Sequence, residues 1–181
     1  MNIALFGGSF DPFHIGHEAI VSTLLDRLEI EKLFITPTYI NPFKDSYKID
    51  PVLRLELLEE LYASSNKIEI LSFEVEQKRK VPTFETIEYL ISKYQLDTIY
   101  LVIGADNFNS IDKWTHYDTL KKYVTFVVIT RSGYTIENRT DSYIQIELDF
   151  DVSSTELREN LDLNLIPKKI EKRIEKLWKK D

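Results

Sequence analysis

The sequence predicts an α/β fold of the Rossmann-like, doubly wound kind, with a mostly parallel sheet and helices on both faces. Apolar runs rich in β-branched residues alternate with helical patterns along the chain, which is typical of βαβ units. The two strongest runs, TIYLVI (98–103) and VTFVVIT (124–130), are apolar almost throughout, as expected for strands covered on both faces. Four of the five glycines follow such a run, where the chain turns out of a sheet.

Six runs are expected to form strands, in chain order 2–6 (NIALF), 33–36 (LFIT), 67–71 (KIEIL), 98–103, 124–130 and 143–148 (YIQIEL). The first five are apolar and rich in β-branched residues, whereas the last is weaker and alternates. Helical patterns fill the intervals at 17–28, 51–63, 84–94, 106–122, 154–161 and 167–179. Because crossovers between parallel strands are right-handed, this order places helices on both faces of one sheet.

The 181 residues are expected to form one domain, residues 1–181, with a C-terminal helical segment at about 153–179. A hydrophobic content of 43% with 29% charged residues indicates a globular chain rather than a disordered one. The chain has no cysteine, so disulfides and thiolate metal sites are excluded. No apolar run approaches the ~20 residues of a membrane span, and no signal-peptide pattern is present. We therefore expect a cytoplasmic protein with no membrane partner.

The charge balance bears on the class of partner. The formal net charge is −7 and the pI about 5.1, which argues against a nucleic-acid partner, since such proteins usually carry a basic footprint. A locally basic pocket for a phosphorylated small molecule remains compatible with this balance. The last helical pattern, 167–179, combines a basic face with an apolar stripe. It fits either an anionic partner or a solvated face, and the acidic chain as a whole favours the solvated face.

The expected fold also predicts where a ligand binds. In open α/β sheets, ligands bind beyond the carboxyl ends of the strands, where the strand order reverses. Gly7, Gly8 and Gly104 follow expected strands, and glycine allows another group to approach the backbone closely. Gly133, taken alone, favours an ordinary tight turn. The four together favour a ligand cradle.

The stretch GGSFDPFHIGH (7–17) contains the most specific signal in the chain. His14 and His17 are three residues apart on a first helical turn and therefore face the same side. Imidazole donors at a helix N-terminus suit a phosphate group. Two hydrogen-bonded histidines in a turn are the simpler alternative. A zinc site is disfavoured because cysteine is absent and the third histidine, His116, is distant in sequence.

This stretch resembles the N-terminal signature of the nucleotidyltransferase superfamily with an H-x-G-H motif. The resemblance implies transfer of a nucleotidyl group from a nucleoside triphosphate to a small acceptor. It assigns His14 and His17 to binding the triphosphate and stabilising the transition state. It also implies a nucleotide cleft lined by the backbone of four residues, Gly7, Gly8, Ser9 and Phe10.

A second motif stands near the other end of the chain, DVSSTELREN (151–160). Ser153, Ser154 and Thr155 precede a helical pattern and Arg158 lies on its first turn, a combination that suits a polyphosphate. Helix capping alone would also explain the hydroxyls. The segment VSSTELR resembles the I-S-S-T-x-x-R motif of the same superfamily. That resemblance places these four residues at the triphosphate.

Two further segments indicate the acceptor. VPTFETIEYL (81–90) resembles the S-Y-T-x-D-T-L segment of nicotinate mononucleotide adenylyltransferases and implies a substrate-binding Thr83, although Val and Pro replace the usual Ser and Tyr. LVIGADNFNSIDKW (101–114) resembles the I-G-x-D segment of that family. It implies that Gly104 and Asp106 contact the nucleotide and that Trp114 stacks on the pyridine ring, with a half-buried core indole as the alternative. Tyr117 is a weaker candidate for binding the acceptor, beside Thr83 and Trp114.

Two cations complete the expected site. Lys44, in NPFK (41–44), is assigned a catalytic and acceptor-binding role, with a solvated turn lysine as the alternative. Arg131 follows an expected strand where the family often has Arg-Pro-Gly, and it is assigned to ATP.

The resemblance covers residues 2 to about 178 and implies an enzyme of NAD biosynthesis, a nicotinate-nucleotide adenylyltransferase. ATP and nicotinate mononucleotide would be its substrates, with Mg²⁺ accompanying ATP. Adenylyl transfer to nicotinamide mononucleotide or phosphopantetheine, or cytidylyl transfer, stays open. So does a nucleotide-binding sensor without turnover; a structural or nucleic-acid-binding protein is a further alternative. The sequence does not set the oligomeric state, and a homo-oligomer stays open.

Overall fold

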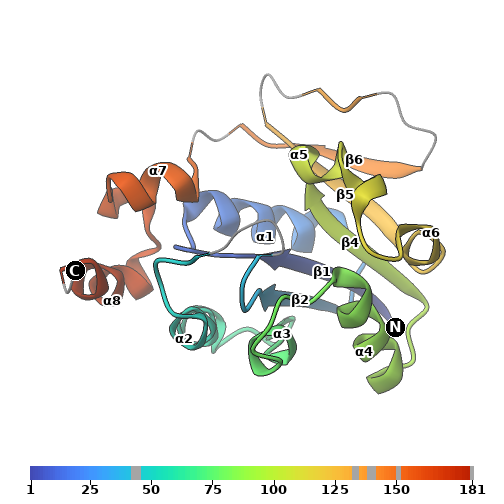
Figure 1. Ribbon diagram of the computed structural model, residues 1–181, viewed down its shortest axis with the longest axis horizontal. Helices are drawn as coiled ribbons and strands as arrows, with labels where there is room; N and C mark the ends of the chain where they lie inside the picture. Colours follow the sequence, from blue (N-terminus) through green and yellow to red (C-terminus); the bar gives the residue numbers. More distant parts are fainter. Residues whose placement is uncertain (42–45, 132–134, 138–141, 150–151, 180–181) are drawn as a thin grey trace.

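The computed structural model describes residues 1–41, 46–131, 135–137, 142–149 and 152–179. Its centre is one six-stranded sheet with the order β3-β2-β1-β4-β5-β6, in which every neighbouring pair is parallel (Figure 1). The strands are β1 Asn2–Gly8, β2 Lys32–Pro37, β3 Ile68–Ile70, β4 Thr98–Gly104, β5 Thr125–Thr130 and β6 Tyr143–Glu147. All six expected strands are confirmed, and with them the doubly wound α/β fold.

The helices are α1 Ile15–Arg27, α2 Pro51–Tyr62, α3 Phe73–Glu76, α4 Thr83–Lys93, α5 Ala105–Phe108, α6 Tyr117–Leu120, α7 Ser154–Glu159 and α8 Lys168–Trp178. Two 3₁₀ turns, η1 Ile111–Lys113 and η2 Leu163–Leu165, lie between them. Five expected helices are confirmed within a few residues. The short helix α3 was not predicted.

The expected helix at 106–122 is wrong, because this segment forms α5, η1 and α6 in succession. Asn109 turns its side chain away from the segment, accepting from the backbone N–H of Glu137 and donating to the carbonyl of Thr135. His116 then adopts a left-handed conformation with φ 57°, which no continuous helix accommodates. A long-range side-chain contact and one left-handed residue therefore override the helical pattern.

The sheet separates two cores, as the alternation along β1 requires. Ala4 and Phe6 face the core built with α1, α2, α7 and α8, whereas Ile3 and Leu5 face the core built with α4, α5 and α6. In Figure 1, α7 and α8 lie at one end of the molecule and α4 to α6 at the other. Both faces of the sheet are covered, which explains the nearly continuous apolar strands.

The strand order reverses between β1 and β4. From β1 the chain continues through β2 to β3 on one side, and from β4 through β5 to β6 on the other. The two central strands end at Gly8 and Gly104, side by side at the carboxyl edge. This is the position at which open α/β sheets bind ligands.

Among the helices of the described residues, none has the length and apolar character needed to cross a bilayer.

Candidate nucleotide site

The turn after β1 is built around a left-handed phenylalanine. Phe10 has φ 49° and is buried, with its ring 5.3 Å from that of Phe6 and 5.5 Å from that of Phe13. A Cβ on Gly8 would lie 2.8 Å from Cε1 of Phe10, so only glycine fits there without moving the ring. The aromatic cluster thus fixes the path of the chain from β1 into α1.

The two predicted histidines form a stacked pair at the start of α1. Their ring centroids are 3.7 Å apart with 25° between the planes. The backbone N–H of His14 donates to Nδ1 of His17 at 3.2 Å. Since Nδ1 accepts, the neutral ring of His17 carries its proton on Nε2 and presents an N–H donor there.

The surroundings keep both histidines neutral. Burial, with a smaller contribution from the Arg131 charge, lowers the pKa of His14 to about 4. Burial first, then His14 and Arg131, lowers the pKa of His17 well below its usual range. At neutral pH the pair therefore acts through N–H donors rather than as imidazolium. Nδ1 of His14 is buried without a hydrogen-bond partner among the described residues, so the site retains an unsatisfied polar atom.

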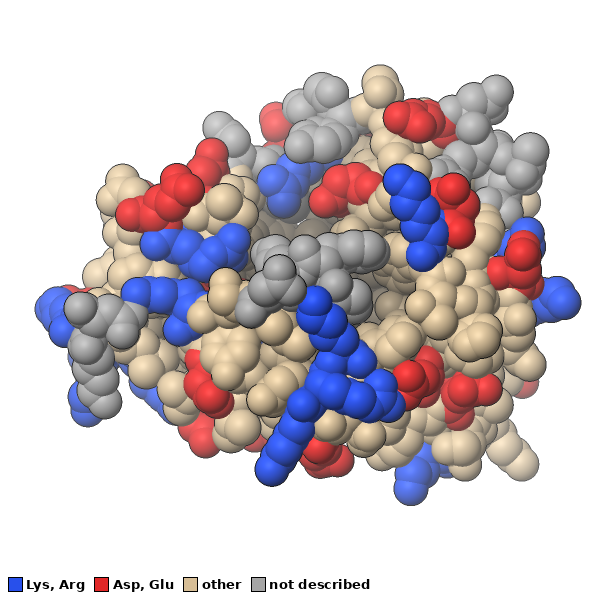
Figure 2. All heavy atoms as spheres, viewed as in Figure 1, with Lys and Arg blue, Asp and Glu red and all other residues tan. Residues whose placement is uncertain are grey.

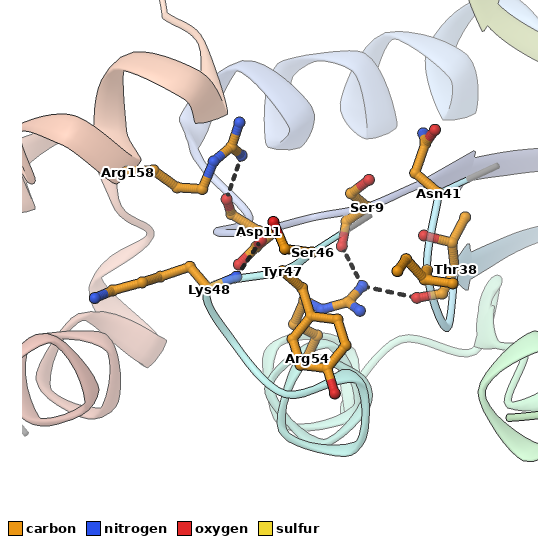
Figure 3. A pocket seen from close by; sticks show the side chains of 10 residues that line it. Ser9, Asp11, Thr38, Asn41, Ser46, Tyr47, Lys48, Arg54 and Arg158 are labelled. Carbon is orange, nitrogen blue, oxygen red and sulfur yellow. Dashed lines mark hydrogen bonds between the residues drawn. The ribbon is translucent and has the colours of Figure 1, made fainter. Parts of the chain in front are cut away.

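The C-terminal motif lies directly against this turn. Arg158 on α7 donates from Nη1 to the carbonyl of Asp11 at 2.9 Å (Figure 3). Its Nη2 donates to Oγ1 of Thr155 at 2.9 Å. The hydroxyl of Ser154 donates to the carbonyl of Pro12 at 3.2 Å. Ser153 caps α7, its hydroxyl oxygen accepting from the N–H of Glu156 at 3.2 Å. Residues 140 or more positions apart are thereby joined.

A cavity of about 580 Å³ opens between the β1–α1 turn, α7 and the segment that leads from β2 to α2. Ten residues line it: Ser9, Asp11, Thr38, Ile40, Asn41, Ser46, Tyr47, Lys48, Arg54 and Arg158 (Figure 3). On the face shown in Figure 2, lysine and arginine side chains lie near the middle of the molecule, although the chain carries a net charge of −7. A cavity with such cations suits an anionic ligand.

Of the ten lining residues, only Ser9 and Arg158 were predicted as site residues, and three of the eight that were missed carry a charge. Asp11 lies inside the GGSFDPFHIGH motif, in which the sequence analysis assigned no role to the carboxylate. Arg54 lies in a helical pattern in which a charged residue normally indicates a solvent face, yet it is 1% exposed. Lys48 follows the NPFK segment by four residues, and no motif found in the sequence includes it.

The predicted acceptor residues form a separate group. Thr83 begins α4, Trp114 follows η1 and Tyr117 begins α6. The rings of Phe84 and His116, 5.0 Å apart, link these elements. Trp114 and Tyr117 pack against the core on that face, and Nε1 of Trp114 is buried without a partner among the described residues. None of the three predicted residues is among those that line the cavity.

The remaining predicted residues fall at the sheet edge or outside the description. Gly104 ends β4, and a Cβ there would lie 2.5 Å from Oδ1 of Asp106, so this glycine allows the Asp106 side chain to fold back over the strand end. Arg131 directly follows β5, and its charge reaches both histidines. Lys44 lies outside the described residues.

A buried carboxyl group beside the VPTFETIEYL segment gives a pH-dependent prediction. Glu74 is 4% exposed and accepts from the hydroxyl of Thr86 at 2.8 Å. Burial raises the pKa of Glu74 to about 7, against the lowering effect of the Thr86 hydrogen bond. A carboxyl group whose pKa is raised in the folded state contributes stability that is fully present below its unfolded pKa, near 4.5. This stability is lost as the pH rises through 7.

We expect Glu74→Gln to remove that dependence, since an amide does not ionise. From pH 4 to pH 8.5 the wild-type protein should lose about 3 kcal/mol of unfolding free energy that the variant keeps. Urea unfolding at the two pH values measures it, with Glu88→Gln, an exposed change on α4, as the control. Equal pH dependence in both variants and the wild type would contradict the assignment.

Comparison with known proteins agrees with this arrangement. The family model described as cytidylyltransferase-like matches residues 5–160. A protein of Aliarcobacter butzleri named "Probable nicotinate-nucleotide adenylyltransferase" is 46% identical over 174 residues, covering 96% of this chain and 95% of the relative. One of the same name from Sulfurimonas denitrificans is 46% identical over 179 residues, covering 99% and 96%.

Solved structures show the same fold. The nicotinic acid mononucleotide adenylyltransferase of Plasmodium falciparum, complexed with NaAD, aligns with a TM-score of 0.73 at 20% identity and covers 96% of this chain and 95% of its own. A second structure of it, complexed with APC, aligns with a TM-score of 0.74 at 19% identity, covering 96% and 94%. The resemblance inferred from the motifs is thus confirmed, and the chain belongs to the cytidylyltransferase-like family and, within it, to the nicotinate-nucleotide adenylyltransferases.

Proposed function

We propose that this protein transfers the adenylyl group of ATP to nicotinate mononucleotide, giving nicotinic acid adenine dinucleotide and pyrophosphate in NAD biosynthesis. The observation that carries the proposal is the hydrogen bond from Arg158 of α7 to the turn that leads into the stacked histidine pair, at the point where the strand order reverses. This junction combines donors and a cation in the place where a triphosphate binds in such sheets. The names of relatives 46% identical to the chain supply the acceptor.

The chemistry requires no protein nucleophile. An oxygen of the acceptor's 5′-phosphate attacks the α-phosphorus of ATP, the bond from that phosphorus to the bridging oxygen breaks, and pyrophosphate leaves. Catalysis then consists of positioning the phosphates and stabilising the charge that develops on them. In this proposal His14 and His17 donate N–H groups to the phosphates, Arg158 and Arg131 add positive charge, and the backbone from Gly7 to Phe10 with Ser154 and Thr155 lines the cleft.

A divalent cation, Mg²⁺ in this proposal, would be held chiefly by the ATP phosphates. Among the described residues, no three histidine, aspartate or glutamate side chains are grouped so as to bind a metal. The carboxylate of Asp11, which lines the cavity, already accepts two backbone N–H bonds. When bound, the ion would neutralise phosphate charge, as Mg²⁺ does with few protein ligands.

The acceptor is proposed to bind toward α4 and α6. Thr83, Trp114 and Tyr117 lie on neighbouring elements there, and the flat indole of Trp114 suits a pyridine ring. Asp106, at the end of β4, is proposed to accept hydrogen bonds from the nucleotide. Lys44 is proposed to bind the acceptor phosphate.

An acceptor comparison tests the proposal. Pyrophosphate release is measured with ATP and Mg²⁺ and, in turn, nicotinate mononucleotide, nicotinamide mononucleotide and phosphopantetheine, then again with CTP in place of ATP. We expect release with ATP and the nicotinate acceptor at least tenfold above every other pair. Equal rates with the amide would overturn the acceptor assignment, and preference for CTP would overturn the donor.

A further inference from the structure

We infer that Arg54 and Asp11 together act as a positioning clamp that fixes the two walls of the cavity relative to each other for phosphate transfer. The inference rests on the proposed function. It concerns two side chains that hold backbone around the cavity and are not assigned to touch substrate.

The guanidinium of Arg54 joins three segments of the chain. Its Nη1 donates to the carbonyl of Ser9 in the β1–α1 turn and to that of Thr38 at 2.8 Å after β2 (Figure 3). Its Nη2 donates to the carbonyl of Tyr39 at 2.9 Å, and its Nε to that of Ile49 at 3.0 Å. Four of the five N–H donors of an arginine are thus bound to backbone oxygens.

The carboxylate of Asp11 connects the β1–α1 turn to the segment that precedes α2. Its Oδ2 accepts from the backbone N–H of Lys48 and its Oδ1 from that of Ile49, each at 2.8 Å. Both ends of the β2–α2 connection, residues 38–39 and 48–49, are therefore tied to the β1–α1 turn. That turn leads directly into His14 and also accepts the hydrogen bond from Arg158.

These contacts distinguish Arg54 from a phosphate ligand. It is 1% exposed, and the ring of Tyr47 lies 5.9 Å from its guanidinium carbon. Burial lowers the pKa of Arg54, while the charge of Asp11 contributes an opposing effect. Arg158, in contrast, is only half-buried at the cavity.

The geometry predicts that the planar fork of Arg54 matters and not merely its charge. A lysine would keep the charge but could not reach carbonyls in three segments from one plane. Once the walls shift, substrate still binds, but the reacting phosphates are misaligned, and a displacement of ~1 Å can cost ~10²-fold in rate. The loss should therefore fall on kcat more than on KM.

The experiment compares Arg54→Lys and Arg54→Met with wild-type protein in steady-state adenylyl transfer. Circular dichroism establishes that each variant is folded at the assay temperature. We expect kcat to fall about 10²-fold in both variants, with the KM values for ATP and the acceptor changed less than threefold. Arg173→Met is the matched control, because it removes another arginine that contacts α2, through Glu56 and Glu60, outside the cavity. Its kcat should stay within twofold of wild type.

Three results would overturn the clamp in an active wild-type protein: recovery of kcat by Arg54→Lys, a tenfold rise in the KM for ATP with kcat retained, or a loss that matches the unfolded fraction. If neither Arg54 variant folds, Asp11→Asn decides: a fall in kcat supports the clamp and an unchanged kcat refutes it. An inactive wild type would instead refute the proposed function.

Discussion

Replacing His17 by alanine is expected to lower kcat for dinucleotide formation by about 10²–10³-fold, the cost typical of removing one donor that stabilises transition-state charge. The reason lies in the arrangement at the start of α1. Nδ1 of His17 accepts from the backbone N–H of His14, so its Nε2–H is the donor that remains for a ligand. The low pKa of the pair means that this donor is neutral at pH 7 and remains a donor through the mildly acidic range.

The control for this experiment is His17→Gln, which places an amide N–H near the position of Nε2. It should retain more activity than the alanine variant, because a neutral donor is what the mechanism requires. Initial rates at saturating ATP and acceptor separate the effect on kcat from weaker binding. An alanine variant within threefold of wild-type kcat would remove His17 from the mechanism.

Changing Arg158 is expected to have the second-largest effect. Its guanidinium reaches the carbonyl of Asp11 and the hydroxyl of Thr155 at once, and it carries positive charge to the cavity. Arg158→Met should lower kcat/KM for ATP by about 10²-fold, since both a charge-assisted contact and the attachment of α7 are lost. Arg158→Lys should recover only part of this, because an ammonium group does not reproduce the planar fork.

Lys172→Met on α8 is the matched control for Arg158, since it removes an exposed cation outside the cavity. Its kcat/KM should be unchanged. If both variants lost activity equally, net charge and not the position of Arg158 would explain the result, and the assignment of α7 to the triphosphate would fail.

The sequence predicted the sheet because the apolar runs are strong and punctuated by glycine. It predicted the histidine pair because His14 and His17 share a motif and a helix face. The contact between α7 and the β1–α1 turn was expected only through the family resemblance, since no local pattern encodes a contact between residues more than 140 positions apart. The prediction of one helix over 106–122 failed because Asn109 bonds to residues 135 and 137, outside the segment, and His116 adopts a left-handed conformation, neither of which periodicity records.

Arg54 is the clearest case of a residue whose position could not be predicted from the sequence. A charged residue in a helical pattern predicts solvent exposure, whereas this one is buried and bonded to carbonyl groups from three segments of the chain. Those acceptors converge only once the sheet has formed. Its role could therefore be inferred from the structure and not from the sequence.

The most direct test of the account is a product analysis. Wild-type protein and His17→Ala are incubated with ATP, Mg²⁺ and nicotinate mononucleotide, and the dinucleotide and pyrophosphate are quantified by mass spectrometry and a coupled assay. We predict equimolar nicotinic acid adenine dinucleotide and pyrophosphate from the wild-type protein, at a rate at least 10²-fold above that of the variant. Pyrophosphate without dinucleotide, or equal rates from the two proteins, would contradict adenylyl transfer at the histidine pair.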